Sequence, residues 1–245
     1  MSEEPASSIL IIGPGGVGKS TAAQILEGRY DSLFEIPSEY QESIHSESYV
    51  LKDDEKVGIV VPPGQRHRRD TWNDVLAAVG AGSFHGIIVV GAYGYHTLGE
   101  TSFKDHRLYH GDDASFLTEF LAENRADELG VVQKLRPHIC ANTHKCWLLT
   151  LVTKQDLWWH QRAEVEKHYR QGKHGTDVDE MIKHCGGHNL RHEFVFGSLI
   201  INNFVTGRGE ELTRTASGYD EKLKTRSLKR LWETLYALKS WEESQ

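Results

Sequence analysis

The stretch "SSILIIGPGGVGKSTAAQILEG", residues 7–28, places a glycine-rich loop between an apolar run and an amphipathic run. Residues 9–12 predict a short buried strand before the loop. The apolar side of the helix predicted after the loop consists of Ala22, Ala23, Ile25 and Leu26. The loop itself, residues 13–20, fits the pattern G-x-x-x-x-G-K-[ST], in which backbone N–H groups curl around phosphates at a helix N-terminus. The stretch therefore predicts a phosphate-binding loop.

Two side chains of this loop have predicted roles in chemistry. Lys19 would reach the β and γ phosphates of a nucleotide, and the Ser20 hydroxyl would be a ligand of Mg²⁺. The residues predicted to contact the nucleotide here are Gly13, Gly15, Gly16, Val17, Gly18, Lys19, Ser20 and Thr21. The motif indicates a triphosphate but does not choose the base, because ATPases, kinases and GTPases share it.

Length and charge narrow the class of protein. A chain of 245 residues is long enough for one large domain, and we expect a single domain, 1–245, with an insertion around 93–136. The net charge of -7 argues against a non-specific nucleic-acid binder.

The termini and the cysteines indicate a compartment. Three cysteines and the acidic start "MSEEPASS" favour the cytoplasm over a secretory route. No apolar run reaches ~18 residues, Ser2 stands where myristoylation needs glycine, and "WEESQ" offers no prenylatable cysteine. We expect no direct membrane anchor.

A second motif concerns the base. The run 147–152 predicts a buried strand of a parallel sheet, and it ends in Thr153, Lys154, Gln155 and Asp156. This order resembles the Ras-like P-loop GTPases, whose guanine-recognition motif is [NT]-K-x-D. The resemblance implies that Asp156 accepts hydrogen bonds from guanine N1 and N2, and that the Lys154 stem lies over the base. A carboxylate that accepts two donors discriminates against adenine.

A third element follows the strand predicted over 192–196. Gly197, Ser198 and Leu199 loosely match the S-A-x turn of the same family, which offers backbone N–H groups to the guanine carbonyl oxygen. The resemblance adds Ser198 and Leu199 to the nucleotide-binding residues. The alternative is an ordinary turn after a strand.

The stretch "SESYVLKDDEKVGIVVPPGQ", residues 46–65, predicts two strands, over 47–52 and 57–61, followed by a loop. Aligning Gly64 and Gln65 with the family's D-x-x-G-Q pattern puts Val61 where the magnesium-binding aspartate belongs. The bacterial gliding-motility and polarity group of Ras-like GTPases also lacks this acid and carries a similar T-V-P-G-Q loop. The resemblance implies that Gly64 meets the γ phosphate and that Gln65 orients the attacking water, so Gln65 and the phosphate-contacting Lys19 are the predicted catalytic residues.

The family's first switch should offer a threonine to Mg²⁺, yet no threonine occurs between Thr21 and Thr71. Ser38 lies closest by spacing and is the predicted metal ligand besides Ser20, with Ser43 and Ser46 as alternatives. Three arginines after Gln65 could aim at the γ phosphate or form a partner-binding cluster; they are Arg66, Arg68 and Arg69.

The resemblance implies an α/β fold, a P-loop NTPase built as a three-layer sandwich with a mostly parallel central sheet flanked by helices. It implies a small Ras-like GTPase that binds GTP and GDP with Mg²⁺, hydrolyses GTP slowly and acts as a switch on protein effectors in intracellular signalling or regulation. Two alternatives stay open: a GTP-binding adaptor without significant turnover, and an ATP-using P-loop enzyme. The histidines and cysteines leave a zinc site conceivable, with no ligands assigned.

Overall fold

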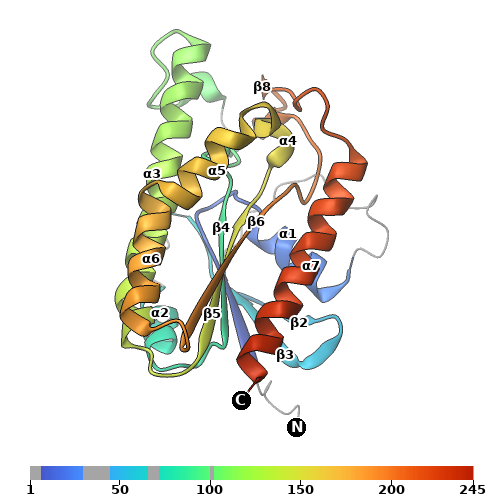
Figure 1. The fold of residues 1–245 in the computed structure, drawn as a ribbon. Helices are drawn as coiled ribbons and strands as arrows, with labels where there is room; N and C mark the ends of the chain where they lie inside the picture. The colour runs from blue at the N-terminus through green and yellow to red at the C-terminus, as the bar shows by residue number, and fades with distance from the viewer. Residues whose placement is uncertain (1–6, 30–44, 66–71, 100–101, 245) are drawn as a thin grey trace.

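The fold is a central sheet with helices on both faces (Figure 1). The computed structural model describes residues 7–29, 45–65, 72–99 and 102–244. Their main sheet has six strands in the order β2-β3-β1-β4-β5-β6. All neighbouring strands pair in parallel except β2 and β3, which are antiparallel. The predicted α/β sandwich with a mostly parallel sheet is confirmed.

The strands of the main sheet are β1 (Ser7–Ile12), β2 (Glu47–Leu51), β3 (Asp54–Val61), β4 (Gly86–Gly91), β5 (Cys146–Val152) and β6 (Leu190–Phe196). A second sheet consists of β7 (Phe204–Val205) and β8 (Glu211–Thr213). The α-helices are α1 (Lys19–Glu27), α2 (Trp72–Gly80), α3 (Asp113–Ala141), α4 (Gln155–Trp158), α5 (Arg162–Gln171), α6 (Lys173–Cys185) and α7 (Glu221–Glu243). Two short 3₁₀ helices are η2 (Phe103–Asp105) and η3 (Trp159–Gln161).

The central strands are apolar because both faces of the sheet are covered. Every residue of β4 and β5 is buried, as expected for parallel strands between two helical layers. The helices α1 and α7 cover one face, while α2, α3 and α6 cover the other (Figure 1). Side chains along β1 point alternately to the two faces of the sheet. Ile9 and Ile11 pack in the core beneath α1 and α7, and Leu10 and Ile12 pack in the core beneath α2, α3 and α6.

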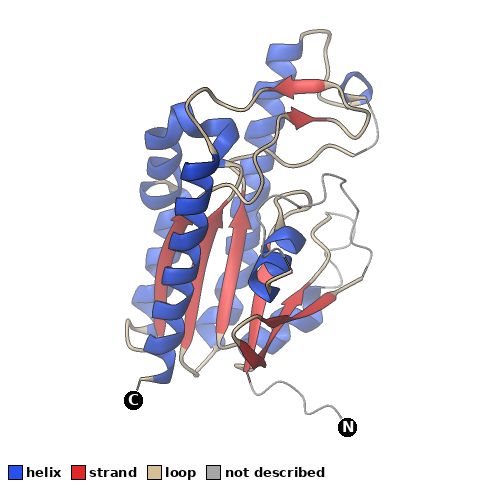
Figure 2. Cartoon of the chain, turned by 90° about the vertical axis from the view of Figure 1, so that its right-hand side faces the viewer, coloured by secondary structure: helices blue, strands red, loops and turns tan. Residues whose placement is uncertain are grey.

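The carboxyl ends of the parallel strands point toward the small β7–β8 sheet (Figure 2). Phe204 of β7 is buried there and packs edge-on against Tyr95, with ring centroids 5.5 Å apart. Nothing in the sequence pattern predicted this sheet. Its position matters because ligands of open parallel sheets bind at this end.

The predicted element boundaries need correction at the β2–β3 hairpin. The second strand begins at Asp54, three residues before the predicted start, and the register shifts between Val50 and Leu51. Residues 93–99 form a loop after β4, and α3, at 29 residues, crosses over to β5. The single-domain and insertion assignments stay predictions. None of the described helices combines the length and apolarity needed to cross a bilayer.

Candidate functional site

The glycine-rich loop connects β1 to α1 and is held by the chain after β4. Gly16 has a φ of 73°, in the left-handed region that favours glycine. A Cβ at Gly16 would lie 2.5 Å from the backbone nitrogen of Thr97, whose N–H donates to the Gly16 carbonyl over 3.1 Å. The loop conformation and its neighbour therefore both require glycine at this position.

Lys19 and Gly64 lie against each other across this loop. Lys19 begins α1, is buried, and donates from Nζ to the Pro14 carbonyl over 2.9 Å. A Cβ at Gly64 would lie 2.1 Å from Lys19 Nζ and 2.6 Å from the Pro14 oxygen. The structure thus brings the loop after β3 directly onto the glycine-rich loop, and only a residue without a side chain leaves room for the ammonium group.

Gln65 lies beside Gly15 of the same loop. A Cβ at Gly15 would be 3.6 Å from both Cα and Cγ of Gln65. The Gln65 Oε1 atom is buried and has no hydrogen-bond partner among the described residues. A buried amide oxygen without a partner is costly, so this atom is a candidate to accept a bond from a ligand or water at the loop.

Ser20 contacts an acidic side chain that the sequence motifs did not single out. Its Oγ donates to Oε1 of Glu47, the first residue of β2, over 3.2 Å. Tyr49 donates its hydroxyl proton to the other oxygen of Glu47. A hydroxyl and a carboxylate are the hard oxygen donors that Mg²⁺ prefers, and Mg²⁺ sites commonly use only one or two protein groups plus phosphate oxygens. The donor set beside the loop therefore fits Mg²⁺.

The other predicted metal ligand, Ser38, lies outside the described residues, as do Ser43 and the arginine cluster after Gln65. Ser46 is described and exposed. Thr21 lies in the first turn of α1. Across the described part of the chain, no three His, Cys, Asp or Glu side chains gather as a metal site, so no zinc ligands are assigned.

Thr153 and Lys154 attach the end of β5 to the glycine-rich loop. The Thr153 hydroxyl donates to the Val17 carbonyl over 2.7 Å. Lys154, with a left-handed φ of 57°, donates from Nζ to the Gly16 carbonyl over 2.9 Å and to the Tyr95 carbonyl over 2.6 Å. Burial lowers the pKa of Lys154 to about 8, against the opposing effect of nearby carboxylates. A strained backbone and a buried cation in one residue are typical of a functional position.

Asp156 follows in the first turn of α4 and is held by a second turn of the chain. Its Oδ1 accepts from the Ser198 hydroxyl, and its Oδ2 accepts from the Asn202 N–H over 3.1 Å. Burial raises the pKa of Asp156, and these hydrogen bonds oppose that rise. Leu199 lies beside the glycine-rich loop, because a Cβ built at Gly18 would be 3.4 Å from Leu199 Cδ1. The structure thus gathers both predicted base-binding segments beside the glycine-rich loop.

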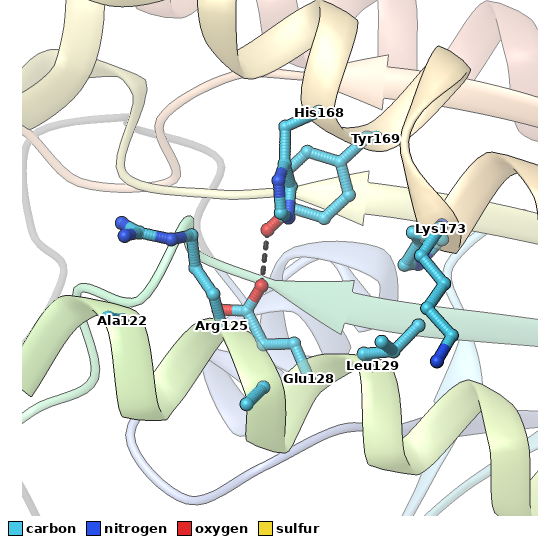
Figure 3. A pocket seen from close by; sticks show the side chains of 9 residues that line it. Ala122, Arg125, Glu128, Leu129, His168, Tyr169 and Lys173 are labelled. Carbon is cyan, nitrogen blue, oxygen red and sulfur yellow. Dashed lines mark hydrogen bonds between the residues drawn. The ribbon is translucent and has the colours of Figure 1, made fainter.

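A buried carboxylate on α3 organises the chain between β4 and the loop. Glu128 Oε1 accepts from the backbone N–H groups of Ala92 and Gly94, over 3.0 and 2.9 Å, and lies 2.9 Å from His96 Nε2. Its Oε2 accepts from the hydroxyl of Tyr169 (Figure 3). Burial alone would raise the pKa of Glu128, but these hydrogen bonds outweigh it and lower the pKa to about 2.

The same part of α3 lines a cavity of about 250 Å³ between α3 and α5. Arg125, Glu128, His168 and Tyr169 surround it, and Figure 3 shows the Glu128 carboxylate directed at the Tyr169 hydroxyl. This cavity is separate from the glycine-rich loop. At its edge, Glu128 connects Tyr169 of α5 to the loop after β4.

Sequence reasoning missed Glu47, Asn202 and Glu128. Asn202 acts through its backbone, so its residue type carried no signal. Glu128 is an acid on an otherwise apolar stripe of α3, with Val131, Val132 and Leu135, and that misplaced charge was the available clue. Glu47 opens a predicted strand, and only the hairpin register shows which residue it faces.

The comparisons with known proteins give distant structural likenesses. No family model matches the chain, and no curated protein matches it. A signal recognition particle receptor SRb-GTP/SRX complex from Chaetomium thermophilum is 15% identical, with 90% of this chain and 97% of that chain covered and a TM-score of 0.44. The mammalian SRP receptor structure is 15% identical, with 78% and 91% covered and a TM-score of 0.41.

An S. thermophilus NFeoB variant bound to GDP.AlF4- is 12% identical, with 79% of this chain and 57% of that chain covered and a TM-score of 0.40. All three TM-scores lie below 0.5, so the proposals below rest on this chain's own residues. The narrower resemblance of the 61–65 loop to gliding-motility GTPases stays a prediction.

Proposed function

We propose that this protein is a Ras-like guanine-nucleotide-binding protein that hydrolyses GTP slowly and changes its protein contacts with nucleotide state. One observation carries the proposal. Lys154 and Thr153 are bonded to the Gly16 and Val17 carbonyls, so the strand end that bears Asp156 is tied to the phosphate-binding loop. A phosphate site and a base-reading carboxylate are thereby held at one edge of the sheet.

The choice of guanine follows from the chemistry of Asp156. An ionised carboxylate only accepts hydrogen bonds, at roughly four lone-pair positions. Ser198 and Asn202 each donate to one oxygen, which leaves capacity for two further donors. Guanine presents adjacent N–H donors at N1 and N2, whereas adenine presents no donor pair there. Adenine would therefore leave the buried carboxylate without its partners.

The phosphate end supplies the groups for hydrolysis. Lys19 would bind the β and γ phosphates, and the Gly64 N–H would meet the γ phosphate. Ser20 would hold Mg²⁺, and the ion would offset the negative charge of the phosphates. The buried Gln65 oxygen would accept a hydrogen bond from the attacking water and orient it.

Nucleotide identification on the purified protein tests this proposal. We expect guanine nucleotides in the denatured extract, and GDP rather than ATP to displace a fluorescent guanine nucleotide. Asp156→Ala should weaken GDP binding on the order of 10²–10⁴-fold, since two hydrogen bonds to a charged group are lost. Asp179→Ala, an exposed aspartate on α6, is the matched control and should bind like wild type. Equal displacement by ATP, or unchanged GDP binding in Asp156→Ala, would refute the base assignment.

One specific observation favours the alternative function, a GTP-binding adaptor without significant turnover. Val61 is buried and apolar where the family's magnesium-binding acid belongs. Single-turnover release of phosphate from bound GTP, with and without Mg²⁺, separates an enzyme from a binding adaptor. A Mg²⁺-dependent phosphate signal supports the GTPase, and unchanged GTP after many hours supports the adaptor.

A further inference from the structure

The magnesium site of the proposed function lacks an acid at one expected position. Val61 ends β3 and is buried in the core formed with α1, together with Val17 and Ala22. Its side chain offers no atom that could contact a cation or its waters. Any carboxylate that serves this site must therefore come from another element.

Glu47 is placed to supply it. The antiparallel register of β2 and β3 puts Glu47 directly opposite Val61, and directly opposite residues project their side chains on the same face, with Cβ atoms about 5 Å apart. The Glu47 carboxylate reaches Ser20 Oγ at 3.2 Å. The acid missing from the end of β3 is thus present on the neighbouring strand, in contact with the hydroxyl that would bind the metal.

The direction of that hydrogen bond matters. Ser20 donates its proton to Glu47, so this hydrogen bond uses the hydroxyl proton and none of the lone pairs of the Ser20 oxygen. A carboxylate behind a ligand orients it and raises its basicity, as outer-shell carboxylates do at many metal sites. Tyr49 donates to the other carboxylate oxygen and limits the rotation of Glu47.

We propose that Glu47 is the positioning carboxylate of the magnesium site, replacing across the β2–β3 pair the acid that Val61 lacks. This inference rests on the proposed function. It assigns Glu47 to orienting Ser20 and to adding negative charge beside the cation, and it makes no claim on the base.

Metal affinity of the GDP complex is the decisive measurement. Mn²⁺ replaces Mg²⁺, and electron paramagnetic resonance counts free and bound Mn²⁺ in titrations of the protein saturated with GDP. Glu47→Gln keeps the shape and removes the charge, so its Mn²⁺ affinity should fall by about 10- to 100-fold. GDP affinity in excess EDTA should stay unchanged. Glu55→Gln, an exposed residue of β3, is the matched control and should keep wild-type Mn²⁺ affinity.

A double variant tests whether an acid at the end of β3 can replace the acid on β2. Val61→Asp in the Glu47→Gln background returns a carboxylate to the facing position and should recover at least part of the lost Mn²⁺ affinity. A merely structural role of Glu47 would not be rescued in this way. If Glu47→Gln does not fold, which the loss of its thermal unfolding transition would show, the same Mn²⁺ titration is made on Glu47→Asp. The side chain of this variant is shorter but still charged, so its Mn²⁺ affinity should fall less than tenfold.

The outcomes separate the two proposals. If wild-type protein binds no guanine nucleotide in EDTA or in Mg²⁺, the proposed function fails and the role of Glu47 fails with it. If wild-type protein binds GDP and Glu47→Gln binds Mn²⁺ as tightly as wild type, the role of Glu47 alone is wrong. Weakened metal binding with intact EDTA-state GDP binding supports it.

Discussion

Two residues at this site adopt arrangements that are costly in an ordinary protein interior. Gln65 Oε1 is buried without a partner among the described residues, and Lys154 adopts a left-handed backbone while its ammonium group bonds backbone carbonyls. Such arrangements cost free energy unless a ligand or the surrounding structure offsets them. Both residues lie at the glycine-rich loop, which is where a ligand would provide that compensation.

The first prediction at this scale concerns Gln65. Gln65→Leu removes the oxygen that would orient water but keeps a similar volume, so single-turnover GTP hydrolysis should fall on the order of 10²-fold. GTP and GDP affinities should change less than threefold. Gln133→Leu, on α3 away from the loop, is the control for loss of an amide. Hydrolysis that survives Gln65→Leu at the wild-type rate would remove Gln65 from the mechanism.

The second prediction concerns His174 and acid pH. Burial lowers the pKa of His174 to about 4, below the ~6.5 of an unfolded chain. The unfolded state therefore binds the proton first, and stability is present above pH ~6.5 and lost as pH falls toward 4, by up to about 3 kcal/mol. His174→Phe should flatten this loss in urea titrations between pH 7 and 4.5. The exposed His184 of the same helix gives the matched control, His184→Gln, and an equal acid loss in both variants would contradict the assignment.

At the scale of elements, α3 helps to fix the position of the glycine-rich loop. Glu128 bonds the chain just after β4 at Ala92 and Gly94, and a few residues further Thr97 bonds the Gly16 carbonyl over 3.1 Å. Tyr169 brings α5 to the same carboxylate. The position of the glycine-rich loop therefore depends on helices that contact no nucleotide.

Glu128→Gln tests this connection. The change replaces a charged acceptor of several hydrogen bonds by a neutral amide, so the free energy of unfolding should fall by about 3 kcal/mol. GDP affinity should also fall, since Thr97 is less firmly held against Gly16. Glu119→Gln on the exposed side of α3 is the control. Urea unfolding and a GDP titration measure the two effects. Full GDP affinity in a destabilised Glu128→Gln variant would show that Glu128 does not influence the glycine-rich loop.

At the scale of the whole molecule, the site joins segments from both halves of the chain. The glycine-rich loop, the loop after β3, the end of β5 and the turn after β6 meet at the carboxyl edge of one sheet (Figure 2). A ligand that contacted all four would stabilise the folded state as a unit, because the unfolded chain has no such site.

Thermal unfolding should report this linkage. GDP with Mg²⁺ at 100 times its Kd should add about 2.7 kcal/mol, which for a chain of this size raises Tm by about 5–10 °C. ATP at the same concentration should give no more than a small fraction of that shift, and Asp156→Ala should lose it. Equal shifts with ATP and GDP would place the protein among the ATP-using P-loop enzymes.

Local patterns were sufficient for the parts of the fold that are contiguous in sequence. The strand, glycine loop and helix of residues 7–28 are consecutive, and the buried run of β5 needed no partner to be recognised. The β2–β3 hairpin shows the limit. Counting from the Leu51–Asp54 pair would place Glu47 opposite Gly58, but the register shift after Val50 moves it to Val61. No residue pattern in the sequence marks such a shift.

The sequence by itself determined the strand–glycine loop–helix unit, the predicted phosphate and base motifs and the α/β class, because each depends on residue types at fixed local spacing. Only the tertiary structure decided that Glu47 faces Val61 and contacts Ser20, and that Glu128 holds the chain beside Gly16. The Ser20–Glu47 and Gly94–Glu128 contacts join residues 27 and 34 positions apart. They follow from strand register and helix packing, which are set by the whole core rather than by neighbours along the chain.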